Sequence, residues 1–223
     1  FDVHVHLRDG EASLTKYESE VRDAGIELAG LGVMWFGGPN QALAGNPADI
    51  RTRNDAMIAL AAKHPEVVPI ATVHPYDGRA AHDELTRVAG RGIKTLKLHP
   101  HTQKFEVSDE RVFSLVEKAG ELGVTVLMDN AAILPGDSQK LFNLAVRASK
   151  TRFIFAHMGT IDFRFWNIIA LARTAEGFAL ENVCFDISGP VQLFADSPLE
   201  AEFIWTMRNV GIERILLGSD YPQ

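Results

Sequence analysis

Four residues that lie far apart along the chain could together bind one divalent cation. His4 and His6 are separated by a single residue, and His157 and Asp220 lie much later. In an extended strand, side chains two positions apart point to the same face, so both imidazoles can reach one ion. His157 and Asp220 could complete its coordination from other strands. Nitrogen and oxygen ligands of this kind suit zinc, with manganese, iron or cobalt as alternatives.

Strand-like apolar runs that recur about every 30 residues would position these groups. They are Phe1–His6, Gly32–Phe36, Val67–His74, Ile93–His99, Val124–Asp129, Arg152–His157, Val183–Ser188 and Arg214–Asp220. Segments with helical spacing lie between them; one starts at Asn46-Pro47, where proline suits a first helical turn. Strands that alternate with helices imply a parallel sheet with right-handed crossovers. The sequence therefore predicts an α/β fold, a single (β/α)8 TIM barrel over residues 1–223.

An open, doubly wound sheet is the competing architecture. It would place a glycine-rich phosphate-binding turn after the first strand, whereas this chain has Leu7-Arg-Asp-Gly10 there. The chain opens at Phe1 inside a strand-like run and ends three residues after Asp220. We therefore expect terminal segments outside this sequence, including the helix after strand eight.

Polar residues gather at the carboxyl ends of the predicted strands. They are His4, His6, His74, Lys97, His99, Asp129, His157, Asp186, Ser188 and Asp220. In TIM barrels the active site forms at this end of the strands. Taken alone, His157 could be a hydrogen-bonded rim residue and Asp220 could cap a loop. Together they favour a metal site, because burying such groups without partners is costly.

Composition limits the function classes. Formal net charge is −7, with 22 Lys+Arg against 29 Asp+Glu, so no basic surface for nucleic acid is expected. No apolar run approaches the roughly 18 residues of a membrane span, and no signal-peptide pattern opens the chain. The one cysteine, Cys184, permits a reducing compartment. We expect a cytoplasmic protein that binds neither nucleic acid nor membranes.

Four segments carry a resemblance to a known family. Asp2-Val-His-Val-His6, Leu96-Lys-Leu-His-Pro100, Phe155-Ala-His-Met-Gly159 and Leu217-Gly-Ser-Asp-Tyr-Pro222 resemble the amidohydrolase superfamily. The closest likeness is to the branch of aminocarboxymuconate-semialdehyde decarboxylase and related TIM-barrel metal-dependent hydrolases. The resemblance implies that His4 and His6 bind the metal, and that Asp220 binds it and moves a proton. It makes His157 a ligand in binuclear members, or an acid/base group beside the metal in mononuclear ones.

Asp129 departs from this pattern, which has a ligand histidine at the end of strand five. If the Asp129 carboxylate is a ligand instead, it adds negative charge, weakens Lewis acidity and favours a harder ion such as manganese. If it is not a ligand, the metal site is weak or lost.

A second resemblance, of His4-Val-His-Leu-Arg-Asp-Gly10 to the opening of dihydroorotase, implies that Arg8 binds a substrate carboxylate. In that family a carboxylated lysine bridges two metals, and Lys97 stands at a matching place. Because the strand-five histidine is missing, we expect one metal rather than two. The alternatives are a rim salt bridge for Arg8 and a pairing of Lys97 with a carboxylate, for example Asp129.

The expected function is hydrolysis of an amide, cyclic amide or lactone through a metal-activated water, with Asp220 and His157 as catalytic residues. Basic groups near the mouth favour a small anionic substrate; the substrate-binding candidates are Arg8, His74, Lys97 and His99. Decarboxylation is the first alternative, and a degenerate barrel that binds a ligand without catalysis is the second. Similar proteins are often dimers, which leaves a homodimer open.

Overall fold

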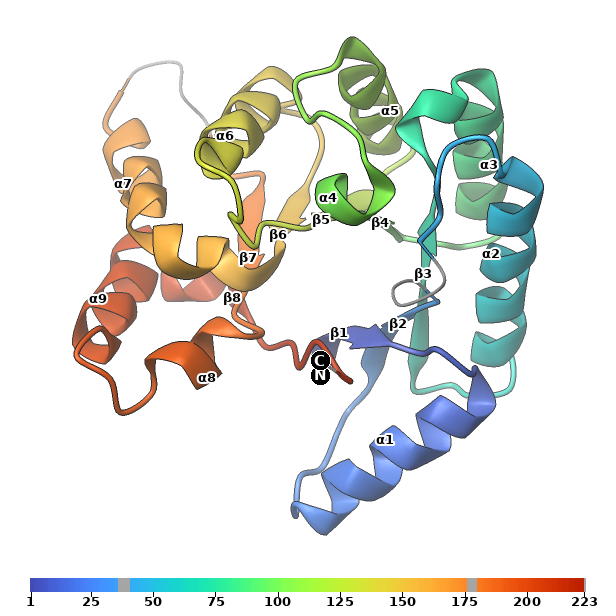
Figure 1. Cartoon of the computed structure of the whole chain (residues 1–223), viewed down its shortest axis with the longest axis horizontal. Coiled ribbons are helices and arrows are strands. Elements are labelled where there is room, and N and C mark those ends of the chain that lie inside the picture. Colours follow the sequence, from blue (N-terminus) through green and yellow to red (C-terminus); the bar gives the residue numbers. More distant parts are fainter. Residues whose placement is uncertain (36–40, 176–179, 223) are drawn as a thin grey trace.

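The chain forms the predicted barrel. A computed structural model describes residues 1–35, 41–175 and 180–222. Within them, eight parallel strands pair in chain order, and helices surround the ring (Figure 1). The strands are β1 (Asp2–His6), β2 (Leu31–Met34), β3 (Val67–Thr72), β4 (Thr95–Leu98), β5 (Thr125–Met128), β6 (Phe153–Phe155), β7 (Val183–Asp186) and β8 (Ile215–Leu216). This confirms the (β/α)8 architecture over the open sheet.

The ring closes where the last segment meets the first strand. β8 itself pairs with β7, and the residues after it run beside β1. The Val3 amide donates to the Leu217 carbonyl at 3.0 Å, and the His6 amide donates to the Tyr221 carbonyl at 2.8 Å. The predicted strand Arg214–Asp220 is therefore shorter as a strand, but its continuation still hydrogen-bonds to β1.

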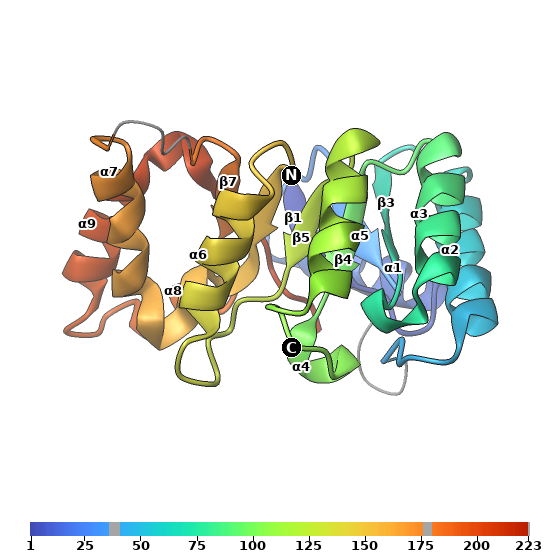
Figure 2. The same ribbon diagram turned by 90° about the horizontal axis from the view of Figure 1, so that it is seen from above.

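Helices lie between successive strands along the chain, with two each in the β4–β5 and β7–β8 connections, and the longer ones lie outside the strands (Figures 1 and 2). Their bounds are α1 (Glu11–Asp23), α2 (Pro47–Ala61), α3 (Arg79–Gly90), α4 (Pro100–Gln103), α5 (Glu110–Glu121), α6 (Asp137–Arg147), α7 (Ile168–Ala172), α8 (Pro190–Phe194) and α9 (Glu200–Val210). Short 3-10 segments are η1 (Pro75–Asp77), η2 (Ala156–Asn167) and η3 (Ile212–Arg214). Pro47 opens α2 as predicted, because its fixed φ and missing N–H suit a first turn.

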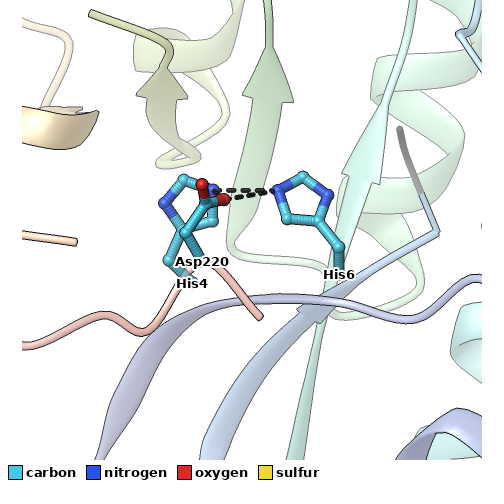
Figure 3. Close-up of side chains that lie close together, drawn as sticks. All are labelled: His4, His6 and Asp220. Carbon is cyan, nitrogen blue, oxygen red and sulfur yellow. Dashed lines mark hydrogen bonds and ion pairs between the residues drawn. The ribbon is translucent and has the colours of Figure 1, made fainter. Parts of the chain in front are cut away.

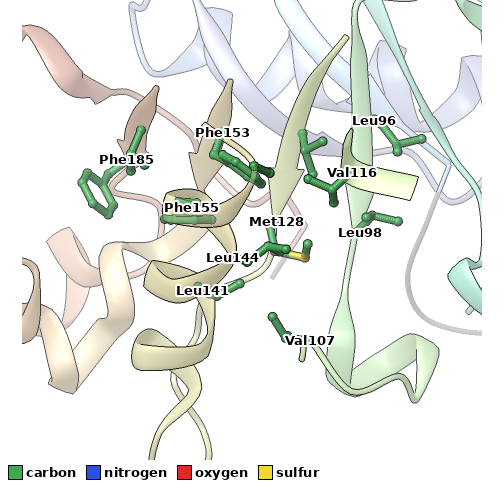
Figure 4. Packing of buried hydrophobic residues seen from close by; sticks show 14 of the residues in the cluster. Leu96, Leu98, Val107, Val116, Met128, Leu141, Leu144, Phe153, Phe155 and Phe185 are labelled. Carbon is green, nitrogen blue, oxygen red and sulfur yellow. The ribbon is translucent and has the colours of Figure 1, made fainter. Parts of the chain in front are cut away.

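Alternate strand residues build the core between sheet and helices. Leu96 and Leu98 of β4, Met128 of β5 and Phe153 and Phe155 of β6 are all buried in one cluster (Figure 4). Helices α5 and α6 contribute to the same cluster, through residues that include Val116, Leu141 and Leu144. Full burial of a side chain of this size contributes roughly 1.5–3 kcal/mol. The other strand face, which carries Lys97 and His4, points into the barrel.

Several predicted strands end earlier than expected. Lys97 and Asp186 lie within β4 and β7. The segments that follow β3, β4, β5, β6 and β7 carry His74, His99, Asp129, His157 and Ser188. The end of the predicted strand Gly32–Phe36 lies outside the described residues, since β2 ends at Met34. No helix among the described residues is long and apolar enough to span a membrane.

Strand parity fails after β6. The alternation predicts that Phe155 and His157 share a face, but Phe155 packs on Trp166 with ring centroids 5.2 Å apart. His157 instead has φ 60°, and its ring lies beside that of His4, with centroids 5.3 Å apart. The prediction was wrong here because a run of left-handed residues, His157 to Thr160, breaks the pleat.

Candidate functional site

Two strand-one imidazoles and one carboxylate converge at the carboxyl end of the barrel. His4 Nε2 lies 3.0 Å from His6 Nε2. Asp220 Oδ1 lies 3.2 Å from each of these two nitrogens (Figure 3). His4 is fully buried, His6 nearly so, and the Asp220 side chain is 20% exposed. Three donor atoms thus share one small space that solvent reaches from the Asp220 side.

The closing contacts of the barrel position Asp220. Its amide donates to the His4 carbonyl at 2.9 Å, which places the carboxylate beside the ring of His4. Asp2, at the start of β1, accepts from the Ser219 amide at 3.0 Å and from the Tyr17 hydroxyl at 2.6 Å. Asp220 has φ 57°, a conformation that is uncommon for residues other than glycine. Neighbouring hydrogen bonds therefore hold a strained residue in the site.

A second carboxylate, Asp186 at the end of β7, supports His4 from the other side. His4 Nδ1 lies 3.0 Å from Asp186 Oδ2. Asp186 Oδ1 accepts from the backbone amides of His157 at 3.2 Å and Ser188 at 3.1 Å, and from the Ser188 hydroxyl. Burial opposes ionisation of Asp186, but its interactions with His4 and with the charge of His157 keep its pKa below the usual value. Asp186 is thus a buried carboxylate with a full set of partners.

His157 pairs with Asp129 rather than with the Asp220 group. His157 Nε2 lies 3.2 Å from Asp129 Oδ1, and His99 Nε2 lies 3.5 Å from the same oxygen. Burial would lower the pKa of His157, but the hydrogen bond and charge of Asp129 outweigh it and raise the pKa to about 9. For Asp129, burial is likewise outweighed, and the hydrogen bond from His157 with the charges of His99 and Lys97 lowers its pKa. The pair is therefore ionic, with the cation on His157.

Lys97 lies between the two groups at the centre of the barrel. Its side chain is 1% exposed, and Nζ is 3.1 Å from His4 Nε2. Burial lowers the pKa of Lys97, and the charges of Asp129, Asp186 and Asp220 oppose that shift. Burial, followed by the effect of the Lys97 charge, lowers the pKa of His4 to about 4. His4 is therefore a neutral imidazole at neutral pH.

Arg8 and His74, both predicted to bind substrate, differ in their exposure and in their hydrogen-bond partners. Arg8 follows β1, is exposed and makes no ion pair with the residues that the structure describes. His74 is buried, its Nε2 lies 2.7 Å from the Gln103 carbonyl and its Nδ1 accepts from the Tyr76 amide at 3.0 Å. Substrate binding by Arg8 stays a prediction, whereas both ring nitrogens of His74 already have protein partners.

The donor set fits a divalent cation. Two triplets among the described residues bring one ligand atom each within 4.8 Å of one another, His4–His6–Asp220 and His4–His157–Asp186. The first offers two imidazole nitrogens and a carboxylate oxygen, a combination typical of catalytic zinc and related metals. Asp129 is in neither triplet, so its role as a ligand stays a prediction.

Asp186 and Ser188 were expected at the rim, but their role in the site could not be read from the sequence. The signal was their position at the carboxyl end of β7, on the same end of the barrel as the other polar residues. What was missing was the pairing across the ring, because Asp186 lies next to His4 only when β7 and β1 are two strands apart in a closed barrel. Asp2 was likewise visible in the first motif, but its contact with Ser219 was not.

Comparisons with solved structures agree with the barrel. A Staphylococcus aureus protein assigned to the amidohydrolases matches with TM-score 0.74 and 17% identity, over 99% of this chain and 87% of that one. The 5-carboxyvanillate decarboxylase LigW of Sphingomonas paucimobilis matches with TM-score 0.61 and 20% identity, over 93% and 72%. A 2,6-dihydroxybenzoate decarboxylase complexed with 2,6-dihydroxybenzoate matches with TM-score 0.65 and 16% identity, over 99% and 88%. At these identities the likeness is one of fold.

Sequence comparison gives the family. No curated protein matches the chain significantly. The family model described as Amidohydrolase matches residues 1–223, the whole of the chain. With its eight-stranded barrel and its H-x-H strand facing a late aspartate, the chain belongs to the amidohydrolase family.

Proposed function

We propose that this protein is a metal-dependent hydrolase that cleaves a C–N or C–O bond in a small, carboxylate-bearing amide, cyclic amide or lactone. The convergence of His4, His6 and Asp220 within 3.2 Å of one another carries this proposal. These three residues would hold one divalent cation, with zinc as the first candidate. A bound cation of this kind supplies Lewis acidity and lowers the pKa of water at the site.

The protein's own groups have the charges that hydrolysis needs. Asp220 is partly exposed, and burial is outweighed by the hydrogen bond of His6 and by the interactions with His4 and His157, which lower its pKa. Its carboxylate is thus ionised, and it would accept a proton from water and return it to the leaving group. His157, held as a cation by Asp129, would stabilise the negative charge that develops on a substrate oxygen. Arg8 would bind the substrate carboxylate at the mouth.

Decarboxylation is the second candidate, because two of the structural neighbours described above are named as decarboxylases of aromatic carboxylates. The same site could hold a carboxylate beside the cation, with a protonated group nearby to supply a proton to carbon. His157 is the candidate for that group, since its pKa is raised to about 9. The two reactions differ in product, since only decarboxylation releases carbon dioxide.

The first test is metal content and affinity. We expect near-stoichiometric zinc or manganese in protein expressed with added metal, and loss of binding on Asp220→Asn. The affinity should fall by more than the roughly 10–100-fold typical of a lost outer-shell partner, because Asp220 is a ligand. Asp137→Asn is the matched control, since Asp137 pairs with His101 at 2.9 Å on the same face of the barrel. Wild-type protein without metal would support the degenerate barrel instead.

The second test separates the reactions. Metal-loaded protein is incubated with a panel of small lactones, cyclic amides and aromatic carboxylates, with ring opening followed by chromatography and carbon dioxide followed directly. Turnover of a lactone or amide that requires Asp220 supports the hydrolase. Carbon dioxide release from an aromatic acid, with no hydrolysis across the panel, would overturn it in favour of the decarboxylase.

A further inference from the structure

We propose that Asp186 is a positioning residue that fixes the tautomer of His4 and so keeps His4 Nε2 available to the metal. The inference rests on the proposed metal site of His4, His6 and Asp220. Asp186 is fully buried and would act on the metal only through His4. The strand-seven carboxylate thereby becomes part of the metal site without being a ligand.

The two oxygens of Asp186 have different partners. Oδ1 faces the amides of His157 and Ser188 and the Ser188 hydroxyl, and these groups can only donate to a carboxylate. Oδ2 faces His4 Nδ1 at 3.0 Å. Because an ionised carboxylate accepts hydrogen bonds and cannot donate them, His4 Nδ1 must carry the proton. The neutral imidazole then has its lone pair on Nε2.

The surroundings of His4 Nε2 agree with this tautomer. A charged lysine ammonium can donate hydrogen bonds but cannot accept them. Lys97 Nζ lies 3.1 Å from Nε2. His6 Nε2 and Asp220 Oδ1 lie 3.0 and 3.2 Å away, on the side where the cation would bind. An outer carboxylate that orients a ligating histidine in this way typically contributes 10–100-fold to metal affinity.

Close packing also restricts the position of the His4 side chain. Gly218 passes so near that an added Cβ would lie 2.9 Å from His4 Cβ and 3.5 Å from Asp186 Cγ. The alternative is that Asp186 itself binds a cation together with His4 and His157. Its four donors argue against this, because two of them are backbone amides that cannot turn away.

Asp186→Asn tests the inference at nearly constant volume. The amide oxygen is expected to stay at the Oδ1 position, where three donors converge, which turns the NH2 group toward His4 Nδ1. His4 must then accept at Nδ1 and carry its proton on Nε2, where it blocks the metal. We expect the affinity for Zn²⁺, measured by competition with a chelating dye, to fall 10–100-fold. Asp137→Asn, which makes the same change at a carboxylate that pairs with His101, should stay close to wild type.

A second measurement is made on the wild-type protein. In metal-free wild-type protein labelled with ¹⁵N-histidine, His4 should show a protonated Nδ1 and an unprotonated Nε2 at neutral pH. Its signals are assigned by their loss in His4→Gln. A proton on Nε2 in wild type, or unchanged Zn²⁺ affinity in folded Asp186→Asn, would overturn the inference. If wild type binds no metal but shows the expected tautomer, the metal proposal fails while the role of Asp186 in orienting His4 stands.

Discussion

Two of the residues with proposed catalytic roles have strained backbones. His157 has φ 60° and Asp220 has φ 57°, both in the left-handed region. Such conformations cost on the order of 1–3 kcal/mol each and persist only where the surroundings impose them. The Asp186 carboxylate holds the amide of His157, and the His4 carbonyl holds the amide of Asp220. The orientation of these two side chains is therefore maintained at a cost in folding stability.

The His157–Asp129 ion pair predicts a pH dependence for the stability of the metal-free protein. The pKa of His157 rises from 6.5 to about 9 on folding, so folding favours its protonated form. The stabilisation is fully present below pH 6.5 and is lost as the pH rises through about 9. We expect urea unfolding of chelator-treated wild type to show a free energy of unfolding that is lower by about 3 kcal/mol above pH 9 than below pH 6.5.

His157→Gln is the control for this prediction, because it removes the titrating group and leaves a side chain that can still hydrogen-bond. The variant should lose most of the decrease between neutral and alkaline pH. An equal decrease in wild type and His157→Gln would mean that other groups cause it.

At the scale of the elements, one buried amide joins α2, β3 and α3. Asn54 of α2 donates to the Thr72 carbonyl at 2.9 Å and to Glu84 at 2.8 Å, and its oxygen accepts from the Thr72 amide at 3.0 Å. Glu84 in turn pairs with Arg87. The side chain thus satisfies the backbone of β3 at its last residue, next to the barrel interior.

Asn54→Ala should destabilise the protein by about 2–4 kcal/mol, because it leaves several buried polar groups without a partner. Chemical denaturation measures this loss. Asn209→Ala on α9 is the comparison, since Asn209 donates one part-buried hydrogen bond, to Asn167 at 2.7 Å. A loss no larger than that of Asn209→Ala would show that water replaces the contacts of Asn54.

For the whole molecule, the proposed metal site lies where the barrel closes. His4 and His6 are on the first strand, and Asp220 is on the segment that pairs with it after the last strand. A cation held by these three residues would tie the two ends of the barrel together. Metal binding and closure of the barrel should therefore be linked.

Removal of metal is expected to lower the midpoint of thermal unfolding. Free metal at 1,000 times its Kd stabilises the native state by about 4 kcal/mol, if the unfolded chain binds none. Scanning calorimetry with chelator and with added Zn²⁺ measures the difference. His6→Gln should abolish it. An unfolding midpoint of wild type that does not change with added metal would count against a metal site where the barrel closes.

The sequence alone determined the order and type of the main elements and the end of the barrel that carries the chemistry. Alternating apolar runs and helical segments have periods that depend only on local geometry, so they can be recognised without contacts. The H-x-H spacing placed His4 and His6 on one face for the same reason. Their convergence with Asp220 followed from the rule that strand ends meet at one rim.

Only the tertiary structure decided which polar residues touch which. It paired His157 with Asp129, and it brought Asp186 against His4 across the ring. It also showed that His74 is occupied by Gln103 and Tyr76 while Arg8 is exposed. These pairings depend on barrel closure and on the left-handed turn at His157. Strand periodicity does not extend through that turn, so contacts between segments far apart in the sequence cannot be predicted from local patterns.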